Sequence, residues 1–193
     1  MSRICAGAGI PAQRRLLGSA ATRDRVRAAI TGAAAAIDPH GLLVLTFAGH
    51  SERGEAGVQW CLYDGGLPLH EVADMLTGVP ASARIVVVND TCYAAALATL
   101  VQPSLALVLL AACGADQLTL ARPTSDFVVR LEQLVYPAGI RNPSCTTYTW
   151  LDQELRRDTP DAERPGVWTH HTDAWRHRPF ALSRSGSTCD PED

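Results

Sequence analysis

The sequence lacks any apolar run long enough to cross a bilayer. Its longest runs, residues 42–48 and 106–113, fall far short of the roughly 20 residues that a spanning helix needs. No sustained apolar stretch follows basic residues near the N-terminus, so we expect no signal peptide. The net charge of −3 carries no excess of positive charge that would favour nucleic acid. The sequence therefore predicts a cytoplasmic protein with neither a membrane nor a nucleic acid as partner.

Cysteine pairs of the kind that hold structural zinc are also absent. The six cysteines are scattered along the chain, and no two form a Cys-x-x-Cys pair. A chain of this length without a signal peptide favours free thiols over disulfides. Near the C-terminus, His170, His171, Asp173 and His177 match the spacing of no familiar metal site, and a solvated loop is the expected structure there. We therefore expect no metal and no other cofactor.

Continuous apolar runs of strand length dominate the middle of the chain. They occupy residues 42–48, 84–89 and 106–112, and they lack the alternation of a strand with one wet face. Helical patterns lie before, between and after them, at residues 23–37, 69–77, 93–101, 124–136 and 146–157. Buried strands that alternate with helices predict an α/β fold, with a mostly parallel sheet and helices on both faces.

The remaining segments set the expected domain limits. Residues 1–20 are expected to be irregular, residues 21–182 to form one domain, and residues 183–193 to be a flexible tail. Within the domain, residues 51–57 are expected to be a polar loop and residues 60–63 a short strand. Residues 160–193, which contain four prolines, are expected to be mostly loop and tail.

Two of the buried runs end in residues that can perform catalysis. The first runs into His50 and the second into Cys92. Ligands of open parallel sheets bind at the carboxyl ends of the strands, so two neighbouring strands would bring these side chains together. A nearby imidazole raises the thiolate fraction of a cysteine and later protonates the leaving group. The predicted helix after Cys92 would favour the thiolate further. The backbone N–H groups of Cys92 and Ser51 are the expected oxyanion hole.

The residues around this pair resemble the caspase and metacaspase family in its bacterial form. Residues 43–51, Leu-Val-Leu-Thr-Phe-Ala-Gly-His-Ser, resemble the strand and turn that carry the family's histidine. Residues 84–93, Arg-Ile-Val-Val-Val-Asn-Asp-Thr-Cys-Tyr, resemble the strand and turn of the catalytic cysteine. Residues 60–65, 110–117 and 178–180 resemble further family segments in the same order. His50 and Cys92 lie about 40 residues apart, close to the roughly 50 expected for a caspase dyad.

The resemblance implies a three-layer caspase-like fold and a cysteine endopeptidase. It gives His50 the role of base and Cys92 that of nucleophile. Asp90 occupies the position at which metacaspases line the substrate pocket, which implies cleavage after arginine or lysine through a carboxylate–guanidinium pair. Several metacaspases are activated by calcium, but no acidic cluster in this sequence supports a calcium site.

The sequence also departs from the family pattern. Ser51 stands where the family usually has glycine, and the family's first strand is missing or degraded before residue 18. These departures keep a second interpretation open, that of a catalytically silent module for protein–protein interaction. A third is a cysteine hydrolase that acts on a small amide. Cys92 alone would more often be an inert buried thiol, and Asp90 would serve as a helix cap as readily as a pocket residue. The missing strand predicts a dimer or a partner subunit that completes the sheet.

Overall fold

The fold is seen in a computed structural model, which describes residues 10, 14–119, 126–135, 147–157, 159 and 164–170. The helices in this part of the chain are η1 (Gly18–Ala20), α2 (Arg23–Ala36), α3 (Leu69–Leu76), α4 (Ala96–Leu100), α5 (Asp126–Val135) and α6 (Tyr148–Arg156). The strands are β1 (Leu42–Ala48), β2 (Ser51–Gly54), β3 (Gly57–Leu62), β4 (Gly65–Pro68), β5 (Arg84–Asp90), β6 (Ala106–Ala111) and β7 (Gly166–Thr169).

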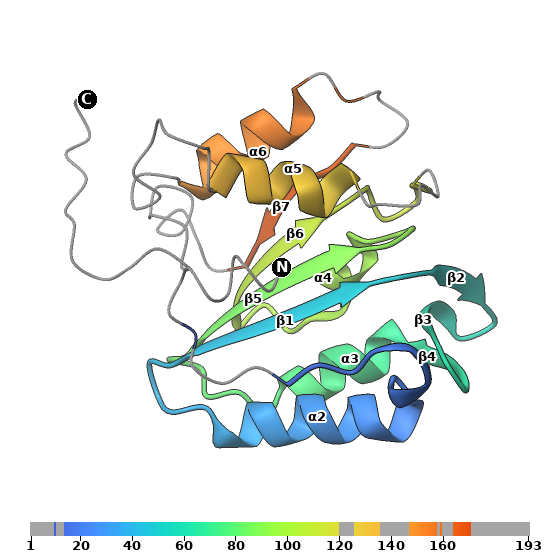
Figure 1. The fold of residues 1–193 in the computed structure, drawn as a ribbon. Helices are drawn as coiled ribbons and strands as arrows, with labels where there is room; N and C mark the ends of the chain where they lie inside the picture. Colours follow the sequence, from blue (N-terminus) through green and yellow to red (C-terminus); the bar gives the residue numbers. More distant parts are fainter. Residues whose placement is uncertain are drawn as a thin grey trace.

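The main sheet has the strand order β1-β5-β6-β7 (Figure 1). β1, β5 and β6 are parallel, and β7 pairs antiparallel with β6. The three parallel strands coincide with the three apolar runs of the sequence. The expected α/β class with a mostly parallel sheet is therefore confirmed.

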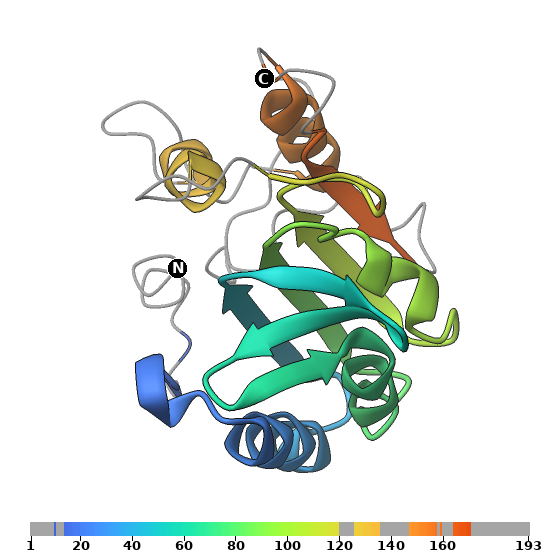
Figure 2. The ribbon, with the colours of Figure 1, turned by 90° about the vertical axis from the view of Figure 1, so that its right-hand side faces the viewer.

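Helices cover both faces of the sheet. Figure 1 shows α2 and α3 on one side and α5 and α6 on the other, and Figure 2 shows the same layers from the side. Alternate residues of β5 face the two layers, with Ile85 and Val87 on the α2–α3–α4 side and Val86 and Val88 on the α5–α6 side. Because both faces are covered, a continuous apolar run is stable in β5, and six of its seven residues are buried.

Two expectations about secondary structure were wrong, those for residues 51–57 and for the helix after Cys92. Residues 51–57 are not a loop, because β2 and β3 form a hairpin that a left-handed Gly57 (φ 95°) closes. Residues 160–193 were expected to be mostly loop and tail, and their described part includes one short strand, β7, which pairs along β6. The helix after Cys92 begins only at Ala96, since Tyr93 adopts φ 55°, a left-handed conformation that an α-helix excludes.

The ends of the chain bear on the expected domain limits. The described N-terminal residues, 10 and 14–22, contain η1, while most of the segment in which the family's first strand was expected to be missing lies outside the described residues. The expected tail at 183–193 lies outside the described residues, as does the motif at 178–180. Within the described ranges, no helix has the length and apolar character that a membrane span requires.

Candidate active site

The turns that follow β1 and β5 lie side by side. The two strands pair in register from Leu42 with Arg84 to Ala48 with Asp90. The N–H of Gly49 continues the ladder and donates to the carbonyl of Asp90 at 3.2 Å. His50 and Cys92 are each the second residue after the last pair, so the parallel strands deliver both to the same end of the sheet.

Ser51 links the two turns directly. Its buried hydroxyl donates a hydrogen bond to the backbone carbonyl of Cys92. The hydroxyl of Thr91 donates to the same carbonyl at 2.9 Å. The residue that replaces the family's usual glycine therefore fixes the backbone of the candidate nucleophile, a role that glycine could not perform.

A buried polar network supports the turn from beneath. The side chain of Asn89, which is 0% exposed, accepts from the indole N–H of Trp60 at 3.1 Å and from the Thr91 hydroxyl at 3.3 Å. Its amide group donates to the carbonyl of Ala94 at 2.9 Å. Phe47 stacks on the Trp60 ring with centroids 4.3 Å apart. The network therefore joins β3, β5 and the Cys92 turn into one packed unit.

The loop after β6 holds the other side of the Cys92 turn. The N–H of Tyr93 donates to the Gln117 carbonyl at 2.7 Å, and the Gln117 side chain accepts from the Gly114 N–H at 2.9 Å. The backbone and side chain of Gln117 therefore fix this loop against the Cys92 turn.

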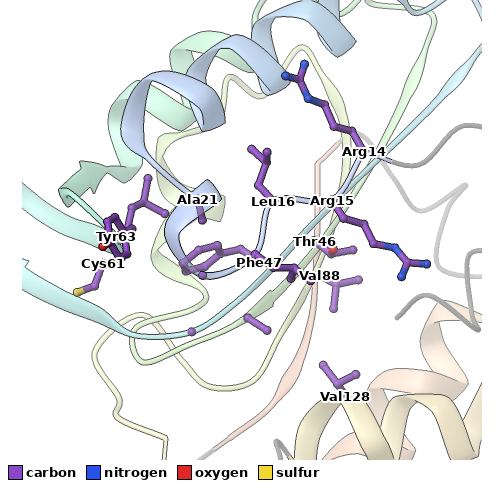
Figure 3. Close-up of a pocket in the computed structure, with 15 residues that line it drawn as sticks. Arg14, Arg15, Leu16, Ala21, Thr46, Phe47, Cys61, Tyr63, Val88 and Val128 are labelled. Carbon is purple, nitrogen blue, oxygen red and sulfur yellow. The ribbon is translucent and has the colours of Figure 1, made fainter.

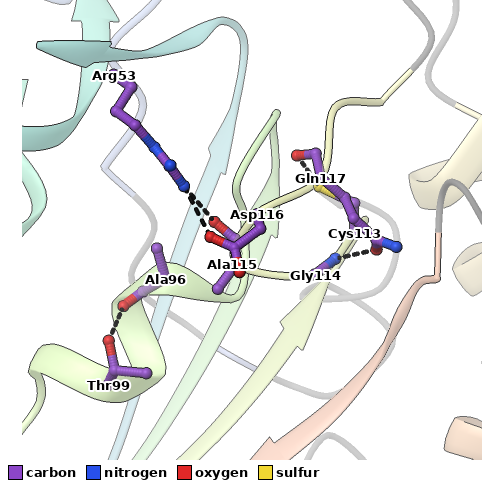
Figure 4. Close-up of polar contacts among 8 residues, drawn as sticks. All are labelled: Arg53, Ala96, Thr99, Cys113, Gly114, Ala115, Asp116 and Gln117. Carbon is purple, nitrogen blue, oxygen red and sulfur yellow. Dashed lines mark hydrogen bonds and ion pairs between the residues drawn. The ribbon is translucent and has the colours of Figure 1, made fainter.

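Arg53 connects this loop to the β2–β3 hairpin. Its guanidinium lies 4.9 Å from the centre of the Tyr93 ring. It also forms an ion pair with Asp116 at 2.8 Å (Figure 4). No sequence motif pointed to Arg53, because its contacts depend on how the hairpin is placed.

The Cys92 thiol makes its described contacts with Thr119. The Cys92 sulfur lies 3.8 Å from both the carbonyl oxygen and the hydroxyl of Thr119. Cys92 is half-buried and His50 is exposed. Among the described residues, no hydrogen bond connects the His50 ring to the thiol. Catalytic hydrogen bonds often tighten only when substrate binds, so the lack of this bond is compatible with a catalytic pair.

The two backbone N–H groups that were expected to form the oxyanion hole, those of Cys92 and Ser51, have different surroundings. The N–H of Cys92 makes no hydrogen bond within the described ranges. Ser51 follows His50, whose carbonyl accepts from the Cys61 N–H at 2.9 Å. Because backbone groups of consecutive strand residues point to opposite sides, the Ser51 N–H faces away from β3.

Asp90 is the last residue of β5 and is buried, with 9% of its surface exposed. Alternation along the strand places its side chain on the α5–α6 face, opposite to Asn89. It therefore lies beside the Cys92 turn rather than in the Asn89 network. No helix begins at the next residues, so the structure does not support the alternative that Asp90 caps one.

Cys61 lies on the strand that pairs with the His50 turn. It is half-buried on β3, and its backbone N–H donates to the His50 carbonyl. Burial raises the pKa of its thiol, and negative charge on Glu52 and on Cys92 adds to the increase. The raised pKa favours the protonated thiol of Cys61.

Metal-binding groups are not found in the described part of the chain, where no three histidine, cysteine or acidic side chains come together. His171, Asp173 and His177 of the C-terminal histidine group lie outside it. The described cysteines, Cys61, Cys92 and Cys113, form no disulfide.

Comparison with known proteins identifies the fold alone. No protein-family model and no curated protein matches the chain. The crystal structure of protein GSU0716 from Geobacter sulfurreducens, a structural genomics target, is similar with a TM-score of 0.73 and 20% sequence identity. The match covers 95% of this chain and 88% of that one. It supports the three-layer α/β architecture and carries no information about activity.

Proposed function

We propose that the protein is a caspase-like cysteine endopeptidase with Cys92 as nucleophile and His50 as base. The observation that carries this proposal is the in-register pairing of β1 with β5, with the two turns linked by Ser51. This arrangement brings a thiol and an imidazole to one end of a parallel sheet, as nucleophilic catalysis requires. The resemblance of both turns to the family motifs supports the same assignment.

The reaction needs one local rearrangement. The Cys92 side chain must rotate away from Thr119 so that its proton passes to the His50 ring. The thiolate then attacks the scissile carbonyl, and the N–H groups of Cys92 and Ser51 stabilise the oxyanion. His50 returns the proton to the leaving amine, which leaves a Cys92 thioester. Water activated by His50 hydrolyses the thioester and restores the thiol.

We also propose that the substrate has arginine or lysine on the acyl side of the cleaved bond. Asp90 is a buried carboxylate two residues before the nucleophile, and a guanidinium is its best-matched partner. A hydrolase without this pocket, one that acts on small amides, would show no such preference.

The test is turnover of a fluorogenic peptide that ends in arginine, compared with one that ends in norleucine. The wild-type protein is expected to cleave the arginyl peptide faster, and Cys92→Ala to lose the activity. Cys61→Ala is the matched control, because it removes the neighbouring thiol and should retain turnover. Full activity of Cys92→Ala would overturn the mechanism, while equal rates on the two peptides would overturn only the role of Asp90.

The silent interaction module is the second candidate, and the contact of the thiol with Thr119 favours it. In that case the folded protein would not react at Cys92 with an arginyl chloromethylketone. Alkylation by this reagent requires a mobile, activated thiol, so stoichiometric labelling of Cys92 would exclude the silent module.

A further inference from the structure

Arg53 extends from the β2–β3 hairpin to the residue that follows the candidate nucleophile. Its guanidinium lies over the ring of Tyr93, 4.9 Å from the ring centre. The same group donates to the Asp116 carboxylate at 2.8 Å and to the Ala115 carbonyl at 3.4 Å, as the dashed lines of Figure 4 show. One side chain of β2 therefore contacts both the Cys92 turn and the loop after β6.

Ser51 and Arg53 meet the Cys92 turn from the same face of β2. Side chains two residues apart on a strand point to the same side of it. The Ser51 hydroxyl bonds to the Cys92 carbonyl, and the Arg53 guanidinium covers Tyr93. Because β2 begins directly after His50, these two side chains hold the His50 turn against the Cys92 turn.

The His50 turn has open space on another side. A pocket of about 550 Å³ lies against the ends of β1 and β3, where Gly49 and Cys61 are part of its lining (Figure 3). Gly49 precedes His50 in the chain, and the Cys61 N–H donates to the His50 carbonyl. Packing on the pocket side therefore leaves room for the turn to shift, and the contacts of β2 with the Cys92 turn become more important for its position.

Tyr93 has a backbone conformation that needs support. Its φ of 55° is left-handed, which costs energy for any residue with a Cβ atom. The peptide between Cys92 and Tyr93 is fixed at both ends, since its carbonyl accepts from the Ser51 and Thr91 hydroxyls and its N–H donates to the Gln117 carbonyl. The guanidinium over the ring holds the side chain as well, and so stabilises the left-handed conformation.

Stability alone explains the ion pair poorly. The side chain of Asp116 is 89% exposed and that of Arg53 is 53% exposed. Ion pairs between exposed side chains contribute little to the free energy of unfolding. The effect of Arg53 should therefore be sought in the placement of the turn that it covers.

We propose that Arg53 is a positioning residue for the proposed endopeptidase reaction. It stabilises the left-handed conformation of Tyr93 and thereby fixes the direction of the Cys92 thiol and N–H relative to the His50 turn. The Cα of Cys92 is bonded directly to the peptide that Tyr93 begins, so a rotation of that peptide would turn both groups. The effect on rate rests on the proposed function, whereas the hold on Tyr93 does not depend on catalysis.

The first test is the rate of amide hydrogen exchange at the Tyr93 N–H, measured by NMR. Arg53→Ala should speed this exchange about two- to fivefold, the factor that corresponds to loss of an exposed cation–π contact. Arg27→Ala is the matched control, because it removes an ion pair of similar length, 2.7 Å to Glu71, between α2 and α3. The control should leave the Tyr93 exchange rate unchanged. Equal exchange rates in Arg53→Ala and the wild type would refute the proposal, whether or not the protein is active.

The second test separates kcat from KM on the arginyl peptide. Arg53→Ala should lower kcat about two- to fivefold and leave KM unchanged, because its effect passes through the Cys92 turn. Arg53→Lys retains the cation and should recover most of the loss, whereas Arg53→Gln should not. A raised KM with unchanged kcat would show that Arg53 contacts the substrate and would refute the positioning role. An inactive wild type with faster exchange in Arg53→Ala would refute the proposed function and confirm the hold on Tyr93.

A double variant tests whether Arg53 acts through Tyr93. Tyr93→Asn removes the ring and introduces a residue that tolerates the left-handed conformation. In the Tyr93→Asn background, Arg53→Ala should change kcat by less than about twofold, since the contact that it removes is already absent. A loss of kcat as large as in the wild-type background would place the action of Arg53 elsewhere and refute the proposal.

Discussion

Replacement of Asn89 by alanine tests whether the buried network holds the Cys92 turn. The substitution leaves the Trp60 indole N–H without its acceptor and the Ala94 carbonyl without its amide donor, and both residues are buried. Each buried polar group that loses its partner costs about 1–3 kcal/mol. Asn89→Ala should therefore lower the free energy of unfolding by about 3 kcal/mol, a large part of the ~5–15 kcal/mol typical of a domain.

Urea unfolding measures this loss of unfolding free energy. An unchanged dependence of the unfolding free energy on urea concentration would show that the substitution changed stability and not the surface exposed on unfolding. Thr99→Ala is the matched control. It deletes a side-chain hydrogen bond to a backbone carbonyl of similar length, 2.9 Å, but on the exposed surface of α4 (Figure 4). The control should change the free energy of unfolding by less than about 0.5 kcal/mol.

A double-mutant cycle separates the network from simple packing loss. Trp60→Phe removes the indole donor while it keeps an aromatic ring against Phe47. In the Trp60→Phe background, Asn89→Ala should lower the free energy of unfolding by about 1–2 kcal/mol less than in the wild type. The reason is that the indole N–H, which would otherwise lose its acceptor, is absent. Additive effects within about 0.5 kcal/mol, or a loss below about 1 kcal/mol for Asn89→Ala alone, would refute the reasoning.

Three further predictions concern the site and the core. Ser51→Ala removes one of the two hydroxyl donors to the Cys92 carbonyl and should lower kcat/KM for the arginyl peptide about tenfold, ~1.4 kcal/mol, with little change in the unfolding midpoint; a loss of stability without a loss of rate would contradict this. The pKa of Cys61 is higher in the folded state than in the unfolded state. The stability linked to this difference is fully present below the unfolded-state pKa and is lost as the pH rises through the folded-state pKa. The wild type should therefore lose more stability than Cys61→Ala from neutral to alkaline pH, as denaturation at each pH would show, and equal losses would count against it. Leu109→Ala, at a fully buried position of β6, should cost about 2–5 kcal/mol, whereas Leu100→Ala, at an exposed position, should cost under about 0.5 kcal/mol.

The parallel strands at the centre of the fold could be predicted from the sequence. Leu42–Ala48, Arg84–Asp90 and Ala106–Ala111 each contain a run of apolar residues and lie between helical patterns, and these features predict parallel strands. The delivery of the His50 and Cys92 turns to the same end of the sheet followed from the same pattern, because strands that pair in register end together.

The contacts that hold the candidate site together could not be predicted in this way. The bond from Ser51 to the Cys92 carbonyl and the ion pair of Arg53 with Asp116 depend on a hairpin whose polar residues indicated only a loop. The left-handed Tyr93 delays the helix that an alanine-rich segment favoured, because a tertiary bond to the Gln117 carbonyl overrides helix propensity. The pattern of Leu42–Ala48 predicted a strand covered on both faces, and the position of this strand at the end of the described sheet is visible only once the strands are ordered.

The most direct test of the dyad is the intact mass of the protein during reaction with an activated arginyl ester. The account predicts a transient acyl adduct that maps to Cys92, is absent in Cys92→Ala, persists in Cys61→Ala, and forms and decays more slowly in His50→Ala. An adduct on Cys61, or one on Cys92 that forms and decays equally fast without His50, would contradict it.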